Sequence, residues 1–144
     1  MNEQQQKTIL LVEDDMIVAL TEKNSLEKNG YNVRIARSGE EAISIFKKKN
    51  AIDLVLMDID LGEGINGAAA AEIILKDNEV PLIFLSGKPE SEAAKLIGKL
   101  PCCGFVSKKA GTGVLNETIK TVLTLFYSNS KNKFENEVLL NNSE

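Results

Sequence analysis

Residues 9–15 read Ile-Leu-Leu-Val-Glu-Asp-Asp, so an apolar run ends directly in three carboxylates. Residues 54–60 repeat the arrangement with Leu-Val-Leu-Met-Asp-Ile-Asp, and two later apolar runs end at Ser86 and at Lys108. If these runs are parallel strands of one sheet, their carboxyl ends meet at the same edge. The carboxylates, the hydroxyl and the lysine then share one small basin, which suits a divalent metal ion and a phosphoryl group.

The composition is that of a single soluble domain. The chain has 144 residues, of which 43% are hydrophobic and 26% charged, and its formal net charge is -4; these values fit one globular domain. Residues 1–7 are polar, so they do not resemble a signal peptide, and no apolar run approaches the roughly 18 residues of a membrane helix. No basic patch indicates nucleic-acid binding. We therefore expect a cytoplasmic protein that contacts neither membrane nor nucleic acid directly.

The absence of histidine and the positions of the two cysteines limit the kinds of catalytic and metal sites that the chain can form. The chain contains no histidine, which excludes histidine-dependent triads and histidine metal sites within it. Its two cysteines, Cys102 and Cys103, are adjacent and lack the spacing of metal ligands. We interpret both as small core residues at the start of a strand.

Strand and helix signals alternate along the chain. Short apolar runs predict strands at residues 8–12, 31–36, 53–58, 81–85 and 103–107. Helical periodicity and capping residues predict helices at residues 15–29, 38–50, 66–77, 90–99 and 112–127. This alternation is typical of an α/β domain in which helices cover both faces of a parallel sheet. We assign the domain to residues 7–128 and expect residues 129–144 to form a polar, flexible tail.

Four motifs, in this order and at strand ends, resemble the CheY-like receiver domain of response regulators. They are residues 12–15 (Val-Glu-Asp-Asp), 56–61 (Leu-Met-Asp-Ile-Asp-Leu), 84–87 (Phe-Leu-Ser-Gly) and 104–108 (Gly-Phe-Val-Ser-Lys). The resemblance covers about residues 7–128. It implies a flavodoxin-like (βα)5 three-layer sandwich with a five-stranded parallel sheet of order 2-1-3-4-5, the order known for that family.

The resemblance also implies a function in two-component signalling. A partner sensor histidine kinase donates a phosphoryl group to an aspartate, and the domain changes conformation to control a downstream protein or effector domain by contact. The face formed by residues 90–99, 103–107 and 112–127 is the output face, through which some receivers form homodimers. The resemblance implies that Asp58 is the phosphoacceptor and that Ser86 and Lys108 contact the phosphoryl group. The implied Mg²⁺ ligands are Glu13, Asp14, Asp58 and the backbone carbonyl of Asp60. Ser86 and Phe105 are the implied switch residues.

The residue types suit this chemistry. Carboxylates gathered at one edge repel one another, so without a cation at least one of them should have a raised pKa. Mg²⁺ relieves the repulsion and takes carboxylate and phosphate oxygens as ligands. Asp58 can then attack phosphorus while Lys108 and Ser86 stabilise the transferring group. Such a domain promotes its own phosphorylation without being an enzyme in the usual sense. Asp15 is interpreted only as the cap of the following helix.

Three features depart from the family pattern. Lys109 stands where the family usually has a proline after the lysine, so we expect a trans peptide bond there and an altered reach of Lys108. Residues 62–64, Gly-Glu-Gly, replace a common Met-Pro pair, and we expect a mobile loop. The side chain of Asp60 adds a carboxylate near the site, and we hypothesise that it changes the lifetime of the phosphoryl group.

Two other functions fit part of the pattern. Asp58-Ile59-Asp60 after an apolar strand imitates the nucleophile motif of haloacid-dehalogenase-like phosphatases, although that family carries the motif on its first strand. The absent proline gives some weight to a receiver-like interaction module that works without phosphorylation.

Overall fold

The computed structural model describes residues 6–48, 51–62, 64–98, 100–101 and 104–142, and for residues 129–142 it describes the backbone alone. Cys102 and Cys103 lie outside the described residues, so their expected place in the core stays a prediction.

The centre of the fold is a five-stranded parallel sheet of order β2-β1-β3-β4-β5, which confirms the predicted topology. The strands are β1 (Thr8–Val12), β2 (Asn32–Ala36), β3 (Leu54–Asp58), β4 (Leu82–Ser86) and β5 (Gly104–Ser107). The central strand β3 and its neighbour β1 are the strands with carboxylates at their ends. The strand order therefore places those two carboxyl ends side by side.

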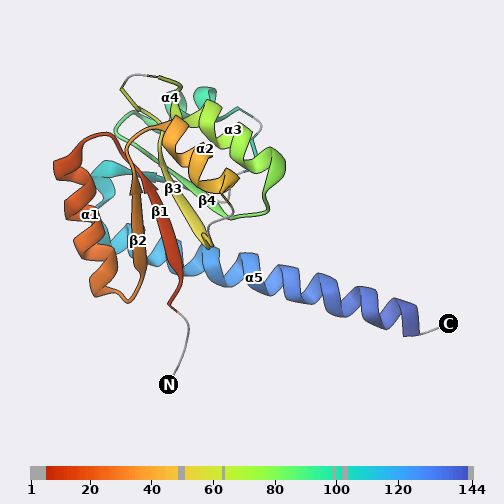
Figure 1. Ribbon diagram of the computed structural model, residues 1–144. Helices are drawn as coiled ribbons and strands as arrows, with labels where there is room; N and C mark the ends of the chain where they lie inside the picture. Colours follow the sequence, from red (N-terminus) through yellow and green to blue (C-terminus); the bar gives the residue numbers. More distant parts are fainter. Residues whose placement is uncertain (1–5, 49–50, 63, 99, 102–103, 143–144) are drawn as a thin grey trace.

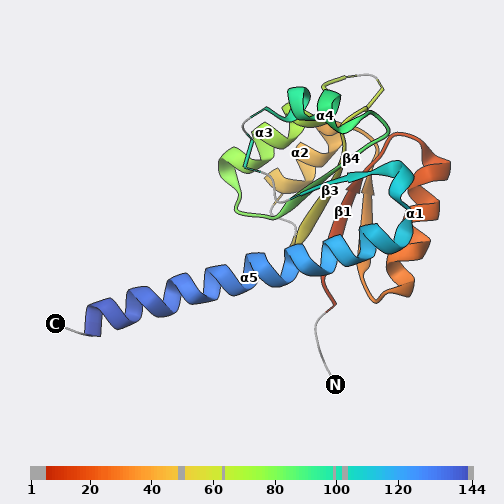
Figure 2. The same ribbon diagram turned by 180° about the vertical axis from the view of Figure 1, so that it is seen from behind.

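Helices cover both faces of the sheet, as predicted for a three-layer sandwich (Figures 1 and 2). One face carries α1 (Met16–Lys28) and α5 (Thr112–Asn142), and the other carries α2 (Gly39–Lys47), α3 (Gly67–Asp77) and α4 (Glu90–Ile97). A short 3-10 helix, η1 (Lys108–Ala110), links β5 to α5. The α1 helix begins at Met16 and is capped, as predicted, by Asp15, whose carboxylate accepts hydrogen bonds from the backbone N–H groups of Ile17 and Val18 at 3.0 and 3.2 Å.

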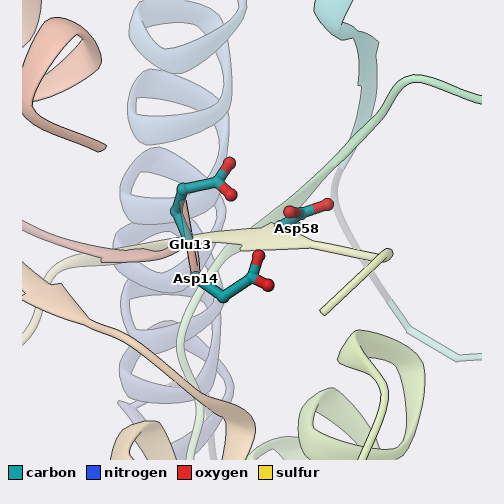
Figure 3. Close-up of side chains that lie close together, drawn as sticks. All are labelled: Glu13, Asp14 and Asp58. Atoms are coloured by element: carbon teal, nitrogen blue, oxygen red, sulfur yellow. The ribbon is translucent and has the colours of Figure 1, made fainter. Parts of the chain in front are cut away.

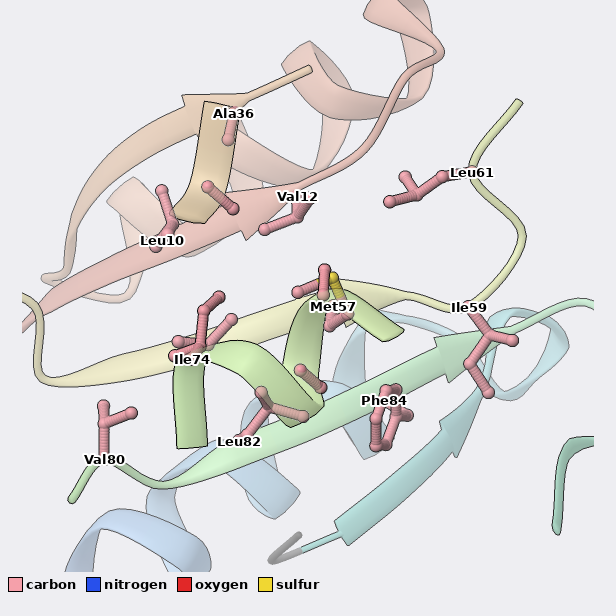
Figure 4. Close-up of a cluster of buried hydrophobic side chains, with 14 of the residues drawn as sticks. Leu10, Val12, Ala36, Met57, Ile59, Leu61, Ile74, Val80, Leu82 and Phe84 are labelled. Atoms are coloured by element: carbon pink, nitrogen blue, oxygen red, sulfur yellow. The ribbon is translucent and has the colours of Figure 1, made fainter. Parts of the chain in front are cut away.

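Two apolar clusters hold the sheet between its helix layers. On the side of α2, α3 and α4, Phe84, Met57 and Ile74 pack together with Leu10 and Val12 (Figure 4). On the opposite side, the alternate residues of β1 pack against α1 and α5 in a second cluster. Both faces of β1 are therefore buried, and each fully buried large apolar side chain contributes roughly 1.5–3 kcal/mol.

The final helix differs from the prediction. We expected it to end at Tyr127, before a flexible tail at residues 129–144, but α5 continues to Asn142. The sequence after Gly113 contains neither glycine nor proline, so nothing in it terminates the helix. Figures 1 and 2 both show the last turns of α5 extending past the sheet. Tyr127 still belongs to the part of α5 that packs on the domain, since its hydroxyl donates to the carbonyl of Asp53 at 2.9 Å.

Candidate functional site

Three carboxylates converge at the carboxyl edge of the sheet. Glu13 and Asp14 follow β1, and Asp58 is the last residue of the neighbouring strand β3 (Figure 3). One carboxylate oxygen from each lies within 4.8 Å of those of the other two. Glu13 and Asp58 are each only 1% exposed, whereas Asp14 is open to solvent. Segments more than forty residues apart in the sequence thus meet as predicted.

Lys108 is the cation of this cluster. Its Nζ lies 3.0 Å from Glu13 Oε1 and 3.0 Å from Asp58 Oδ2, and its side chain is 28% exposed. Such charge-assisted hydrogen bonds are stronger than neutral ones, and here they pair two buried carboxylates with one ammonium group. No peptide bond among the described residues is cis, so the bond from Lys108 to Lys109 is trans, as expected. Lys108 reaches both carboxylates with this geometry.

The site carries more negative charge than it can neutralise. Burial raises the pKa of Glu13, the hydrogen bond from Lys108 lowers it, and the charge of Asp58 raises it again, leaving the pKa at about 7. The sequence predicted a raised carboxyl pKa from repulsion between the carboxylates, whereas burial is the larger cause here. Burial lowers the pKa of Lys108, but its contacts with Glu13 and Asp58 outweigh that effect, so the pKa is raised overall.

Backbone N–H groups hold the carboxylates in place. The N–H of Asp60 donates to Asp58 Oδ1 at 2.9 Å, and the N–H of Gly62 donates to Asp14 Oδ2 at 3.0 Å. The loop after β3 therefore folds back over the acid that follows β1. Only glycine fits at position 62 without a shift, because a Cβ there would lie 2.8 Å from Asp14 Oδ2. Since Glu63 lies outside the described residues, the expected mobility of this loop stays a prediction.

Ser86 and Asp60 lie beside the carboxylates but have different surroundings. Ser86 is fully buried at the end of β4, and its Oγ accepts a hydrogen bond from the N–H of Lys88 at 2.9 Å. The carboxylate of Asp60 forms a partly exposed ion pair with Lys88, with 3.5 Å between Nζ and Oδ1. Sequence reasoning missed this lysine. The available signal was its position two residues after Ser86, in the loop that follows the strand next to β3.

Phe105 lies in β5, beside Phe84 of β4 in the register of the sheet. Its ring is half-buried and packs against the cluster beneath α2, α3 and α4. The strand β4 thus separates it from Asp58 on β3. Its expected role as a switch residue stays a prediction.

The donor set fits a small divalent cation. Hard carboxylate oxygens from Glu13, Asp14 and Asp58 lie close enough to share one ion. Burial and the charge of Asp58 both raise the pKa of Glu13, so a cation would stabilise its charged form. The site also contains a cation, Lys108, and a buried hydroxyl, Ser86, at the ends of two further strands. Within the described part of the chain, every helix is too short or too polar to span a membrane.

Comparisons with protein families and with solved structures indicate the same family. The model of the response regulator receiver domain matches residues 9–120. The chain is similar to the N-terminal domain of a response regulator/sensory box/GGDEF three-domain protein from Carboxydothermus hydrogenoformans, with a TM-score of 0.81 and 38% identity. This structural match covers 86% of the chain and 99% of that domain.

Curated relatives are longer proteins. The chain is 37% identical over 83 residues to the phyllosphere-induced regulator PhyR of Methylorubrum extorquens, a match that covers 57% of the chain and 31% of PhyR. It is 38% identical over 92 residues to the transcriptional regulatory protein YvrH of Bacillus subtilis, covering 63% of the chain and 38% of YvrH. The aligned region therefore spans about a third of the length of each of these relatives.

Proposed function

Because the chain belongs to the family of response regulator receiver domains, which are signalling modules of two-component systems, we propose that it accepts a phosphoryl group on Asp58 from a partner sensor histidine kinase. One observation carries the proposal. The Asp58 carboxylate is buried, bonded to Lys108 at 3.0 Å, and gathered with two further carboxylates at a sheet edge. We place the exchange in the cytoplasm.

In this proposal, a carboxylate oxygen of Asp58 attacks phosphorus, and the bond from phosphorus to the donor's nitrogen breaks, with the electron pair leaving on that nitrogen. The Asp60 N–H fixes the rotation of the Asp58 carboxylate. The Lys108 ammonium is already in contact with Asp58 and donates to the incoming phosphoryl oxygens. The Ser86 oxygen accepts from Lys88, which leaves the Ser86 hydroxyl hydrogen to donate to the same group.

Glu13, Asp14, Asp58 and the backbone carbonyl of Asp60 are the residues that we propose hold Mg²⁺. The ion supplies charge neutralisation for the acidic cluster and for the phosphoryl oxygens. The chain's own part is to hold hard oxygen ligands at one edge. The buried Glu13, with its raised pKa, gives that edge an affinity for positive charge.

The proposed output is a conformational change read by protein contact. Phosphorylation adds about -1.5 to -2 charge and three acceptor oxygens next to Ser86. Movement of Ser86 toward them shifts the end of β4, and the half-buried Phe105 lies on the next strand. We propose that this pair transmits the change to the face formed by α4, β5 and α5, which binds a downstream partner or a second copy of the chain.

Two alternatives have less support. A haloacid-dehalogenase-like phosphatase needs further acids after its lysine, but residues 109–116 contain none. A phosphorylation-independent module has no need of a lysine paired with the carboxylates, yet Lys108 contacts both buried acids. The phosphatase alternative also does not account for the convergence of all four motifs at one edge.

The test is the intact mass of the chain after incubation with acetyl phosphate and Mg²⁺. The wild type should gain one phosphoryl group and Asp58→Asn should gain none. A wild type that stays unmodified supports the interaction module instead. Steady-state hydrolysis of a phosphate monoester supports the phosphatase.

A further inference from the structure

A cavity of about 270 Å³ lies beside the proposed phosphoacceptor site, between α1 and the start of α5. Its walls are mostly apolar and include Val18, Leu85, Val106 and Leu115. Two charged side chains also line it. One is Lys108, which contacts Glu13 and Asp58, and the other is Glu22 of α1.

The carboxylate of Glu22 has one oxygen whose burial needs a physical explanation. Among the described residues, its buried Oε2 has no hydrogen-bond partner. A buried carboxylate oxygen without a donor is unfavourable, and such a group calls for a physical reason. Burial raises the pKa of Glu22, the positive charge of Lys108 lowers it, and the negative charge of Asp58 raises it. The charges of both site residues therefore act on Glu22 across the cavity.

The ammonium group of Lys108 has one more N–H donor than the acceptors that it contacts among the described residues. An ammonium group has three N–H donors, and two of them point to Glu13 and Asp58. For the third donor, the described part of the chain provides no acceptor in the present geometry. Lys108 and Glu22, which have opposite charges, thus line the same cavity, and each has hydrogen-bonding capacity that no described residue satisfies.

Glu13 gives an oxygen to Lys108 in this structure, yet it is also one of the three carboxylates gathered to share a cation. When Glu13 turns to a cation, Lys108 loses one of its two partners and needs another acceptor to remain beside Asp58. Glu22 offers that acceptor, and the cavity provides room for the movement. We propose that Glu22 is a positioning residue for Lys108, which it holds from the side of α1 when Glu13 is engaged by a divalent cation. This inference rests on the proposed function.

The test is a Mg²⁺ titration of the full chain, followed by the NMR signals of the backbone amides of Asp14, Asp58 and Gly62. Glu22→Gln is compared with Glu27→Gln, which removes the same charge from an exposed position on the same helix. We expect half-saturation to need at least about threefold more Mg²⁺ in Glu22→Gln than in Glu27→Gln, a coupling typical of groups in contact. Equal shifts in the two variants overturn the proposal.

A second pair of variants tests whether Glu22 positions Lys108 or affects Mg²⁺ binding only through its own negative charge. In a Lys108→Met background there is no ammonium to hold, so Glu22→Gln should change Mg²⁺ affinity no more than Glu27→Gln does. An undiminished effect there means that Glu22 acts through its charge alone, which overturns the proposal. If Glu22→Gln lacks the spectrum of a folded protein, Glu22→Leu, which matches the apolar walls, takes its place.

The two proposals fail separately. A wild type that binds Mg²⁺ but gains no phosphoryl group contradicts the proposed function and leaves the Mg²⁺ comparison intact. A wild type that is phosphorylated, with Glu22→Gln and Glu27→Gln binding Mg²⁺ alike, contradicts only the role of Glu22.

Discussion

The interior of β1 and the residue that follows it are equally buried and chemically opposite. Ile9, Leu10, Leu11 and Val12 are 0% exposed, and Glu13 is 1% exposed. Burial of the four apolar side chains stabilises the fold, whereas burial of the Glu13 carboxylate raises its pKa to about 7 and disfavours its charge. The comparison teaches that one sheet provides both a stable apolar scaffold and an edge at which a buried carboxylate charge is electrostatically unfavourable.

The largest expected effect tests the apolar side of this comparison. Phe84 is fully buried in the cluster beneath α2, α3 and α4. Phe84→Ala should lower the free energy of unfolding by about 3–5 kcal/mol, because it removes buried area and leaves a cavity. Urea denaturation measures this loss. A change below about 1 kcal/mol would show that the interior is not the main source of stability.

The next largest effect concerns the acidic edge and is measured as the pH dependence of the free energy of unfolding. Glu13 has a pKa of about 7 in the folded chain against an ordinary value of 4.5. The folded state therefore holds the proton more tightly, so the stability that this proton contributes is complete below pH 4.5 and is lost as the pH rises to about 7. Without divalent cations, we expect a loss of up to roughly 3 kcal/mol across this window.

Glu13→Gln is the matched variant for that measurement, since it keeps the shape of the side chain and removes the titration. Its unfolding free energy should fall less across the same window, so that it equals or exceeds the wild type in stability at neutral pH. Parallel pH profiles for the two proteins, recorded by denaturant unfolding at several pH values, would contradict the raised pKa.

A smaller effect concerns the cation itself. At a Mg²⁺ concentration ten times the Kd, the folded wild type should gain about 1.4 kcal/mol through selective binding to the native state. Asp58→Asn removes a proposed ligand and should lose most of this gain. Thermal unfolding with and without Mg²⁺ measures it, and an equal gain in both proteins would place the ion elsewhere.

The smallest expected effect concerns the hydrogen bond by which the backbone N–H of Gly62 holds the Asp14 carboxylate. A Cβ at position 62 would lie 2.8 Å from Asp14 Oδ2, so Gly62→Ala should displace that carboxylate and weaken its hydrogen bond. We expect Mg²⁺ affinity to fall about two- to tenfold, the equivalent of one such bond. Gly113→Ala, where a Cβ meets nothing within 4 Å, is the control. Equal Mg²⁺ affinities would show that Asp14 is not held by this loop.

Most of the fold and the meeting of Glu13, Asp14, Asp58 and Lys108 could be predicted from the sequence. Apolar runs buried on both faces leave few arrangements for parallel strands, and polar residues at their ends must then gather at one edge. The ion pair of Asp60 and the place of Glu22 beside the cavity could not be predicted in the same way. They depend on the packing of a loop against its neighbour and of a helix against the sheet, which strand-end patterns do not specify.

The end of α5 was missed for another reason. In the sequence, the regular apolar positions of this helix end near Tyr127, so periodicity alone predicts an end there. Continuation to Asn142 depends on the absence of a terminating residue, a weaker signal than burial.

The central claim is that this edge directs a phosphoryl group to a single carboxylate. Peptide mapping by mass spectrometry of the chain treated with acetyl phosphate, in the presence of Mg²⁺ and in the presence of a chelator, tests it directly. The account predicts one Mg²⁺-dependent modification on the peptide that contains Asp58. A modification that forms equally well in chelator, or that lies on a peptide without Asp58, would contradict it.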